Sequence, residues 1–281
     1  MPTYETPKPI TATIEVAVGD VRIRADEGGH TTVDVRASDP ANDDDVKIAE
    51  QTRVECRSGH LLVKAPRPRS WLSRGRGGSI DVTIELPAGS EVHGAGQSTD
   101  FRGDGRLGDC RIKTGIGQVQ LQQAGAISLK TGIGDVVVDH VAGHAEVTTG
   151  SGDVRLRELG SSAVIKSSNG DTWVGTAAGD ARLSAANGGI AVDAARGSVV
   201  AKSANGDVRL GGVARGSVVL ETSLGDLEVG IPEGTAAWLD VRAAAGKVHN
   251  SLDVADAPDS SAQTVEVRAR TSAGDVVVRR P

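Results

Sequence analysis

The sequence predicts an all-β protein: a parallel β-solenoid, or β-helix, with coils of about 18 residues and irregular β-rich capping regions at both ends. Three observations predict this fold. Glycines recur at a nearly constant spacing, apolar residues alternate at fixed places after each glycine, and large core-filling side chains are scarce. Aromatic residues make up 2% of the chain, whereas 37 of its 281 residues are glycine. Small apolar residues stacked in identical layers fill a narrow interior without large aromatic side chains, so this composition favours a repeat fold.

The repeat is marked by glycines that follow one another at a nearly constant interval through the middle of the chain. Sharp bends often need a positive φ, which glycine adopts without steric cost, so each glycine is expected at a turn. The structural turn glycines are Gly117, Gly134, Gly152, Gly170, Gly188, Gly206 and Gly225.

Apolar residues stand mostly two and four places after each of these glycines, as Val154 and Leu156 do after Gly152. This alternation is typical of a strand with one buried face. A second alternating pair, such as Ala163 and Ile165, precedes the next glycine. No segment between the strands has the length of helical pattern that a crossover helix needs. Each strand should therefore pair in parallel with its equivalent one coil away, around a flattened or triangular cross-section of either hand.

The polar residues of each turn predict contacts between coils. The aspartate that follows most turn glycines is expected to accept hydrogen bonds from turn amides. Hydroxyl residues three places before the glycines are expected to form ladders from coil to coil. These hydroxyl residues are Thr131, Thr149, Ser167, Ser203 and Thr222.

The repeat becomes irregular towards both ends, and this divides the chain into three regions. Residues 1–95 are predicted to form an irregular β-rich cap, residues 96–230 the regular coils, and residues 231–281 degenerate coils and a second cap. Within the first region, strand-like alternation spans residues 10–25, 32–37, 46–56, 61–64 and 80–86. In the last region, residues 239–248 resume the repeat loosely and residues 265–280 are expected to close the second edge of the solenoid.

These repeats carry a family resemblance. Residues 131–138 (TGIGDVVV), 149–156 (TGSGDVRL) and 203–210 (SANGDVRL) are flanked by residues 84–92 (IELPAGSEV) and 229–252 (VGIPEGTAAWLDVRAAAGKVHNSL). The succession resembles the bacterial candidate-adhesin family of β-strand-repeat proteins, a family of unknown function, from about Ile10 to the C-terminus. The resemblance implies the repeat fold and exposure at the cell surface, and it brings no catalytic residues.

Charge and termini narrow the classes of function. The net charge is −6, from 37 acidic and 31 basic residues that are interspersed along the chain. This balance argues against a general nucleic-acid surface, and no DNA-binding signature is present. The N-terminus shows no secretory signal, and no apolar run is long enough to be a transmembrane segment. We therefore expect cytoplasmic residence, unless another export route carries the protein to the cell surface.

The residue types that bind metals are dispersed. Cys56 and Cys110 lack zinc-site spacing and are too few for a disulfide scaffold, so both are expected to be buried thiols. His140 and His144 are close in sequence but lie at a turn, where surface exposure is the simpler interpretation. The repeated aspartates lack the extra glycines of calcium-binding β-helix repeats. We expect no metal site, no catalytic residues and no cofactor.

Two features are candidates for contact with a partner. Residues 66–78 form the one locally basic stretch, which is also typical of a plain surface loop. Trp173 is expected to project outward from the regular coils, unless a flanking segment covers it. The candidate contact residues are Arg67, Arg69, Trp71, Arg74, Arg76 and Trp173.

The sequence leaves three candidate functions open. The first is a non-enzymatic, adhesin-like binding or structural module for an unknown protein or envelope polymer. The alternative is a self-assembling cytoplasmic scaffold similar to bactofilins, in which the protein self-associates. A carbohydrate-active β-helix enzyme is disfavoured, because such enzymes need clustered carboxylates and here the acids are spread at one per coil.

Overall fold

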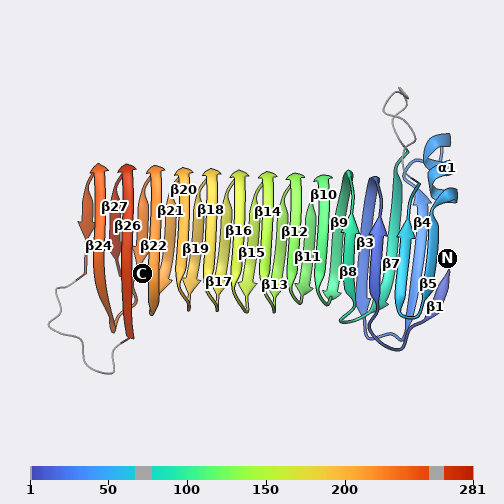
Figure 1. Cartoon of the computed structure of the whole chain (residues 1–281), viewed down its shortest axis with the longest axis horizontal. Helices are drawn as coiled ribbons and strands as arrows, with labels where there is room; N and C mark the ends of the chain where they lie inside the picture. Colours follow the sequence, from blue (N-terminus) through green and yellow to red (C-terminus); the bar gives the residue numbers. More distant parts are fainter. Residues whose placement is uncertain (1, 67–77, 253–262, 281) are drawn as a thin grey trace. The chain divides into compact units, whose positions relative to one another are not determined.

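The computed structural model describes residues 2–66, 78–252 and 263–280. The chain forms two compact units, residues 1–139 and 140–281, and each is described by itself. Both units consist of strands wound into a parallel β-solenoid, as predicted (Figure 1). The described residues contain a single helix, α1, of nine residues. Neither this helix nor any other described segment forms a helix capable of spanning a bilayer.

The described residues of unit 1 form twelve strands and α1, and the strand β13 (Val136–Val141) spans the boundary between the units. The elements of unit 1 are β1 (Thr3–Glu5), β2 (Thr11–Glu15), β3 (Val18–Asp26), β4 (His30–Ala37), α1 (Asp43–Gln51), β5 (Arg53–Arg57), β6 (His60–Lys64), β7 (Ile80–Pro87), β8 (Glu91–Ala95), β9 (Ser98–Arg106), β10 (Cys110–Ile116), β11 (Val119–Ala124) and β12 (Ile127–Ile133).

Unit 1 has two stacks of parallel strands, because each coil contributes one strand to each stack. The first stack runs β6, β2, β8, β10, β12, and the second runs β7, β3, β9, β11. The coil that comes first along the chain, β2 and β3, therefore lies between two coils that come later. Much of the region predicted as an irregular cap, residues 11–26 and 80–95, is in fact parallel coil.

The outer end of unit 1 is closed by strands that run antiparallel to the coils. β5 pairs with β6, β4 pairs with β7, and β1 pairs with β4. Helix α1 packs on β4 and β7. The buried carboxylate of Asp45 accepts hydrogen bonds from the amides of Asp39 (3.1 Å) and Ser79 (3.0 Å), which fastens the helix to the start of β7.

The prediction of a strand over residues 46–56 is wrong for most of that range. Residues 43–51 form α1, and only residues 53–57 are a strand. Asn42 caps the helix by accepting a hydrogen bond from the amide of Asp44 (3.0 Å), and three aspartates fill the first turn. Negative charge at a helix N-terminus is stabilising, so these residues favour the helix over the strand.

Unit 2 continues the repeat with the strands β14 to β27. They are β14 (Ala145–Ser151), β15 (Val154–Leu159), β16 (Ala163–Asn169), β17 (Thr172–Ala177), β18 (Ala181–Asn187), β19 (Ile190–Ala195), β20 (Val199–Asn205), β21 (Val208–Val213), β22 (Gly216–Leu224), β23 (Leu227–Gly230), β24 (Thr235–Ala245), β25 (Val248–Asn250), β26 (Gln263–Ala273) and β27 (Val276–Arg279).

The regular coils of unit 2 have the predicted register. In the first stack Ala145 pairs with Ala163 and Ala163 with Ala181, and in the second Val154 pairs with Thr172. The predicted inward residues are buried, and so are the residues seven places after the glycines, such as Leu159 and Val213. Each coil contributes two strands, so the coils form two stacks of strands. Of the two cross-sections that the sequence left open, this is the flattened one and not the triangular one.

The last coils of unit 2 are not in chain order. β22 pairs with β26, and β26 pairs with β24; in the second stack β23 pairs with β27, and β27 with β25. Figure 1 shows β24 outside β26, and β26 outside β22. The prediction that residues 265–280 close the edge is therefore wrong. They form an internal coil, and residues 235–250 form the outermost one.

The turns combine a backbone requirement with a side-chain ladder. Gly188 has φ +145°, and a Cβ there would lie 2.1 Å from the carbonyl oxygen of Gly170 in the coil before, so only glycine fits. The predicted aspartate contacts are confirmed. Asp171 Oδ1 accepts a hydrogen bond from the amide of Gly189 (2.8 Å), and Asp207 Oδ1 accepts one from the amide of Asp226 (2.8 Å).

The prediction that hydroxyl residues bond to one another from coil to coil is wrong, because they bond to backbone carbonyls. Ser203 and Thr222 donate to the carbonyl oxygens of Gly188 (3.0 Å) and Gly206 (2.9 Å), which are glycines of the preceding coil, and not to one another. Thr131 donates to Gly117 in the same way. The hydroxyls of Thr149 and Ser167 are buried without a hydrogen-bond partner.

The two cysteines differ. Cys110 is buried in β10, and burial, with a smaller contribution from the negative charge of Asp109, raises the pKa of its thiol to about 12. Cys56 in β5 is only half-buried, contrary to the prediction of a buried thiol, because β5 lies in the antiparallel cover and not in the coils. Burial still raises the pKa of Cys56.

Candidate functional site

The candidate site lies on the outward face of the second stack of unit 2. Most coils place a large side chain three residues after the turn glycine: Arg155 on β15, Trp173 on β17, Arg209 on β21 and Glu228 on β23. The coil of β19 has Ala191 at this register, directly between Trp173 and Arg209. Because neighbouring strands lie about 4.8 Å apart, the missing side chain leaves roughly 10 Å between those two residues.

The same coil also lacks the turn aspartate, because Gly189 stands where Asp171 and Asp207 stand in the coils on either side. A Cβ at Gly189 would make only ordinary van der Waals contacts, 3.5 Å from the carbonyl oxygen of Asp207 and 3.6 Å from Asp171 Oδ1, so a side chain is absent here but not sterically excluded. The two gaps join into a groove of about 840 Å³, which we call the Trp173 groove. Its main lining residues are Arg155, Trp173, Gly189, Ala191, Arg209 and Glu228.

Trp173 is held in one orientation at the rim of this groove. Its indole Nε1 donates to Asp193 Oδ1 on β19 (3.1 Å), and the far end of the ring lies over Gly175. A Cβ at Gly175 would lie 3.2 Å from the ring and 2.4 Å from the carbonyl oxygen of Arg157. Glycine at this position therefore lets the ring lie along the sheet. The prediction that Trp173 projects outward is consistent with this placement, and the side chain is half-buried.

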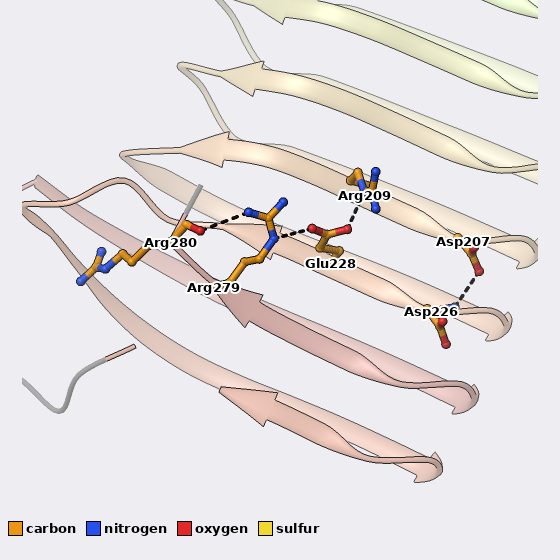
Figure 2. A network of polar contacts seen from close by, with 6 residues as sticks. All are labelled: Asp207, Arg209, Asp226, Glu228, Arg279 and Arg280. Carbon is orange, nitrogen blue, oxygen red and sulfur yellow. Dashed lines mark hydrogen bonds and ion pairs between the residues drawn. The ribbon is translucent and has the colours of Figure 1, made fainter. Parts of the chain in front are cut away.

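The opposite rim is a charged network of three coils (Figure 2). Glu228 accepts hydrogen bonds from Nε of Arg209 and from Nε of Arg279, the latter at 2.6 Å. Partial burial acts to raise the pKa of Glu228, but the hydrogen bonds from Arg279 and Arg209 outweigh it and hold the pKa below its ordinary value. Arg280 donates to the carbonyl oxygens of Ile231 and Pro232, which fixes the chain beyond β27.

The acids of the groove are engaged in structure. Asp171, Asp207 and Asp226 accept hydrogen bonds from backbone amides, and Glu228 is bound by two arginines. In residues 2–66, 78–252 and 263–280, no three His, Cys, Asp or Glu side chains are grouped so as to hold a metal ion. The groove therefore offers hydrogen-bonding groups and one aromatic ring.

The other candidates named from the sequence lie elsewhere. His140 contacts Glu158 (3.2 Å) and His144 contacts Ser162 (2.8 Å), so the two histidines bond to different residues of the next coil. Arg67, Arg69, Trp71, Arg74 and Arg76 fall outside the described residues, and their role stays a prediction.

The gap at Gly189 and Ala191 was not identified from the sequence, although a signal was present. The coil reads Gly-Gly-Ile-Ala where its neighbours read Gly-Asp-Thr-Trp and Gly-Asp-Val-Arg. The partnership of Glu228 with Arg279 had no such signal, because the two residues lie far apart in the chain.

Comparison with proteins of known structure gives distant matches along the whole chain. A candidate adhesin from Parabacteroides merdae is 13% identical and has a TM-score of 0.41, and the alignment covers 100% of this chain and 96% of that one. A candidate adhesin from Bacteroides fragilis is 13% identical, with a TM-score of 0.34 and coverage of 99% and 95%. A candidate cell adhesion protein from Clostridium sporogenes is 10% identical, with a TM-score of 0.24 and coverage of 100% and 98%.

No curated protein matches the sequence of this chain. The model of the Toastrack family DUF4097 matches residues 11–279, which include every coil of both units. This span confirms the resemblance found from the repeats, from about Ile10 to the C-terminus. The chain therefore belongs to the DUF4097 toastrack family.

Proposed function

We propose that the protein is a non-enzymatic, adhesin-like binding module and that its ligand lies in the Trp173 groove. The observation that carries the proposal is the gap at Gly189 and Ala191, beside a tryptophan whose orientation is fixed by Asp193. A regular solenoid face is flat, whereas binding sites are concave and combine apolar surface with a few placed polar groups. The groove is where this face acquires both properties.

The chemistry of the rim favours a chain of sugar residues, such as an envelope polysaccharide. A pyranose ring has an apolar face that stacks on an indole, and its hydroxyl groups hydrogen-bond to charged side chains. Trp173 offers the indole, and Arg155, Arg209 and Glu228 surround it with donors and acceptors. Binding without chemical change is supported by the acids of the groove, which are all engaged in amide or arginine contacts.

The proposal is tested by titration calorimetry with cellohexaose, chitohexaose and polygalacturonate. Trp173→Ala is expected to weaken binding of the recognised saccharide by roughly tenfold or more. Ala191→Gln fills the gap with a side chain that occurs naturally at the same register in Gln120, and it should weaken binding similarly without loss of fold. Val200→Gln places the same side chain on the outward face of the first stack and is the matched control.

Three results would count against this function. These are binding of none of the three saccharides, equal binding by the wild type and Ala191→Gln, and release of shorter saccharides from any of them. The last result would indicate a carbohydrate-active enzyme.

A second candidate is the self-assembling scaffold similar to bactofilins. The observation that favours it is the long strand β24, which in the described residues pairs on one side only, with β26. Growth of filaments at rising protein concentration would support this candidate over a discrete binding module.

A further inference from the structure

Within the residues that the structure describes, no strand covers the outermost coil of unit 2. β24 is eleven residues long, and its backbone is bonded to β26 on one side. No other described strand pairs with its second edge. A long strand with an unpaired edge is a template for pairing with another chain, and proteins normally blunt such edges.

The side chains of β24 show the same incompleteness. Ala237, Leu239 and Val241 face inward, because they pair with Val265, Val267 and Ala269 of β26. Those partners are 2%, 0% and 0% exposed, whereas the three residues of β24 are only partly buried. On the outward face of the same strand, Trp238 is 58% exposed and borders a hollow of about 890 Å³ with Ala236 and Glu266. The inward row of β24 thus lacks one more layer.

The outward charges of β24 are complementary to themselves. Asp240 accepts hydrogen bonds from Arg242 (3.2 Å) and from Arg270 (3.1 Å), so two guanidinium groups share one carboxylate at the edge. If a second β24 lies antiparallel with a two-fold axis at Val241, Asp240 of each copy faces Arg242 of the other. In the same register Val241 faces Val241, and Leu239 faces Ala243. Opposite charges placed directly across an antiparallel pair are stabilising.

We propose that two copies of this chain associate through β24, antiparallel about a two-fold axis at Val241, so that each closes the open coil of the other. In this arrangement the same edge of β24 is used by both copies. Such an isologous contact closes as a dimer and, unlike the filament of the scaffold candidate, does not propagate. This inference uses a different stack from the Trp173 groove and does not depend on the proposed function.

The first experiment is sedimentation velocity of the full chain over a range of micromolar concentrations. The wild type is expected to reach twice the monomer mass of 28.7 kDa and to grow no further. Val241→Lys places a charge in the inward row and should leave a monomer with an unchanged thermal transition, because this position is half-exposed in a single chain.

Charge exchange tests the register. Asp240→Arg and Arg242→Asp, each alone, place like charges across the two-fold axis and should each weaken the dimer by roughly tenfold. The double variant D240R/R242D restores opposite charges and should recover the dimer.

Cross-linking tests the axis, in a Cys56→Ser background that removes the half-buried thiol. Val241→Cys should give a covalent dimer on mild oxidation, and the matched control Leu239→Cys should not, because it faces Ala243 of the other copy. The proposal is overturned by a wild type that stays monomeric or grows beyond a dimer. It is equally overturned if Leu239→Cys cross-links and Val241→Cys does not.

Discussion

The interior coils and the terminal coils of unit 2 share one cross-section but differ in how they are ordered. Between β15 and β21 each strand pairs with its equivalent one repeat later, so that β15, β17, β19 and β21 follow one another in chain order. At the end, Val218 of β22 pairs with Val267 of β26, passing over β24, which lies outside. The periodic pattern therefore specifies the shape of a layer but not its place in the stack.

Burial explains which coil takes the inner place. β26 offers Val265, Val267 and Ala269 to the interior, and all three are buried between β22 and β24. The inward rows of β24 and β26 are similarly apolar, but the second strand of the outermost coil, β25, has Asn250 opposite Val278 of β27, which is 0% exposed. Burying more apolar area releases more free energy, at about 25 cal/mol per Å², so the more apolar coil is better placed inside.

The strongest way to break the regular coils is at a turn glycine. Gly188→Ala forces a Cβ against the carbonyl of Gly170 at a positive φ, and should lower the free energy of unfolding by more than about 3 kcal/mol. Gly189→Ala adds a Cβ one residue later, where it makes only ordinary van der Waals contacts, and should alter the free energy of unfolding by less than about 0.5 kcal/mol. Urea denaturation measures both, and equal losses would refute the role of the stacked turns.

The difference in burial between inner and outer coils is tested by making the same Leu→Ala substitution in each. Leu210→Ala empties a site on β21 that is 1% exposed and should cost about 3 kcal/mol of stability. Leu239→Ala on half-exposed β24 should cost less than about 1 kcal/mol in dilute protein, since little buried volume is lost. A similar loss at both sites would mean that β24 is covered within a single chain.

The coil of β19 also differs from its neighbours in lacking a turn aspartate, and we expect this difference to have a smaller effect on stability. Asp207→Ala leaves the amide of Asp226 without its acceptor and should cost about 1 kcal/mol. Gly189→Asp supplies the missing acceptor and should gain up to about 1 kcal/mol, while it narrows the Trp173 groove and weakens ligand binding. Thermal unfolding measures the stability of both variants, and calorimetric titration measures their ligand binding. A Gly189→Asp variant that is stabilised but binds as the wild type does would argue against the groove as the binding site.

The smallest effect is expected in the pH dependence contributed by Glu228. Its pKa in the folded protein lies below the ordinary value of 4.5, so its pairing with Arg279 and Arg209 stabilises the fold above that pH. This contribution is lost as the pH falls through the lowered pKa. Glu228→Gln should therefore be less stable than the wild type at neutral pH and approach it under acidic conditions. A difference that is constant with pH would contradict the pairing.

The sequence was sufficient for the coils because each buried position repeats. Val154, Leu156 and Leu159 could be placed inside from their spacing alone, and all are buried. Helix α1 was missed because its short apolar pattern, in residues 46–56, reads equally as a strand. The N-cap residue Asn42 and the three acids after it were the signal that separates the two structures.

The order of the end coils was not predictable, because every coil presents the same register to its neighbours. β26 and β24 are both acceptable partners for β22 by pattern, and only the completed stack decides between them. The candidate site was predicted in part. Trp173 could be placed outward by counting, whereas the groove depends on Gly189 and Ala191, whose small size matters only beside the side chains of adjacent coils.

Disulfide trapping across the last coils tests the stacking order most directly. Val219 of β22 pairs with Arg268 of β26, and Arg268 pairs with Asp240 of β24. Adjacent strands place Cα atoms about 5 Å apart, which a disulfide spans, and strands two places apart do not. Val219→Cys with Arg268→Cys should form an intramolecular disulfide, and Val219→Cys with Asp240→Cys should not. A disulfide in the second variant and none in the first would show that the coils follow chain order, which contradicts the fold described above.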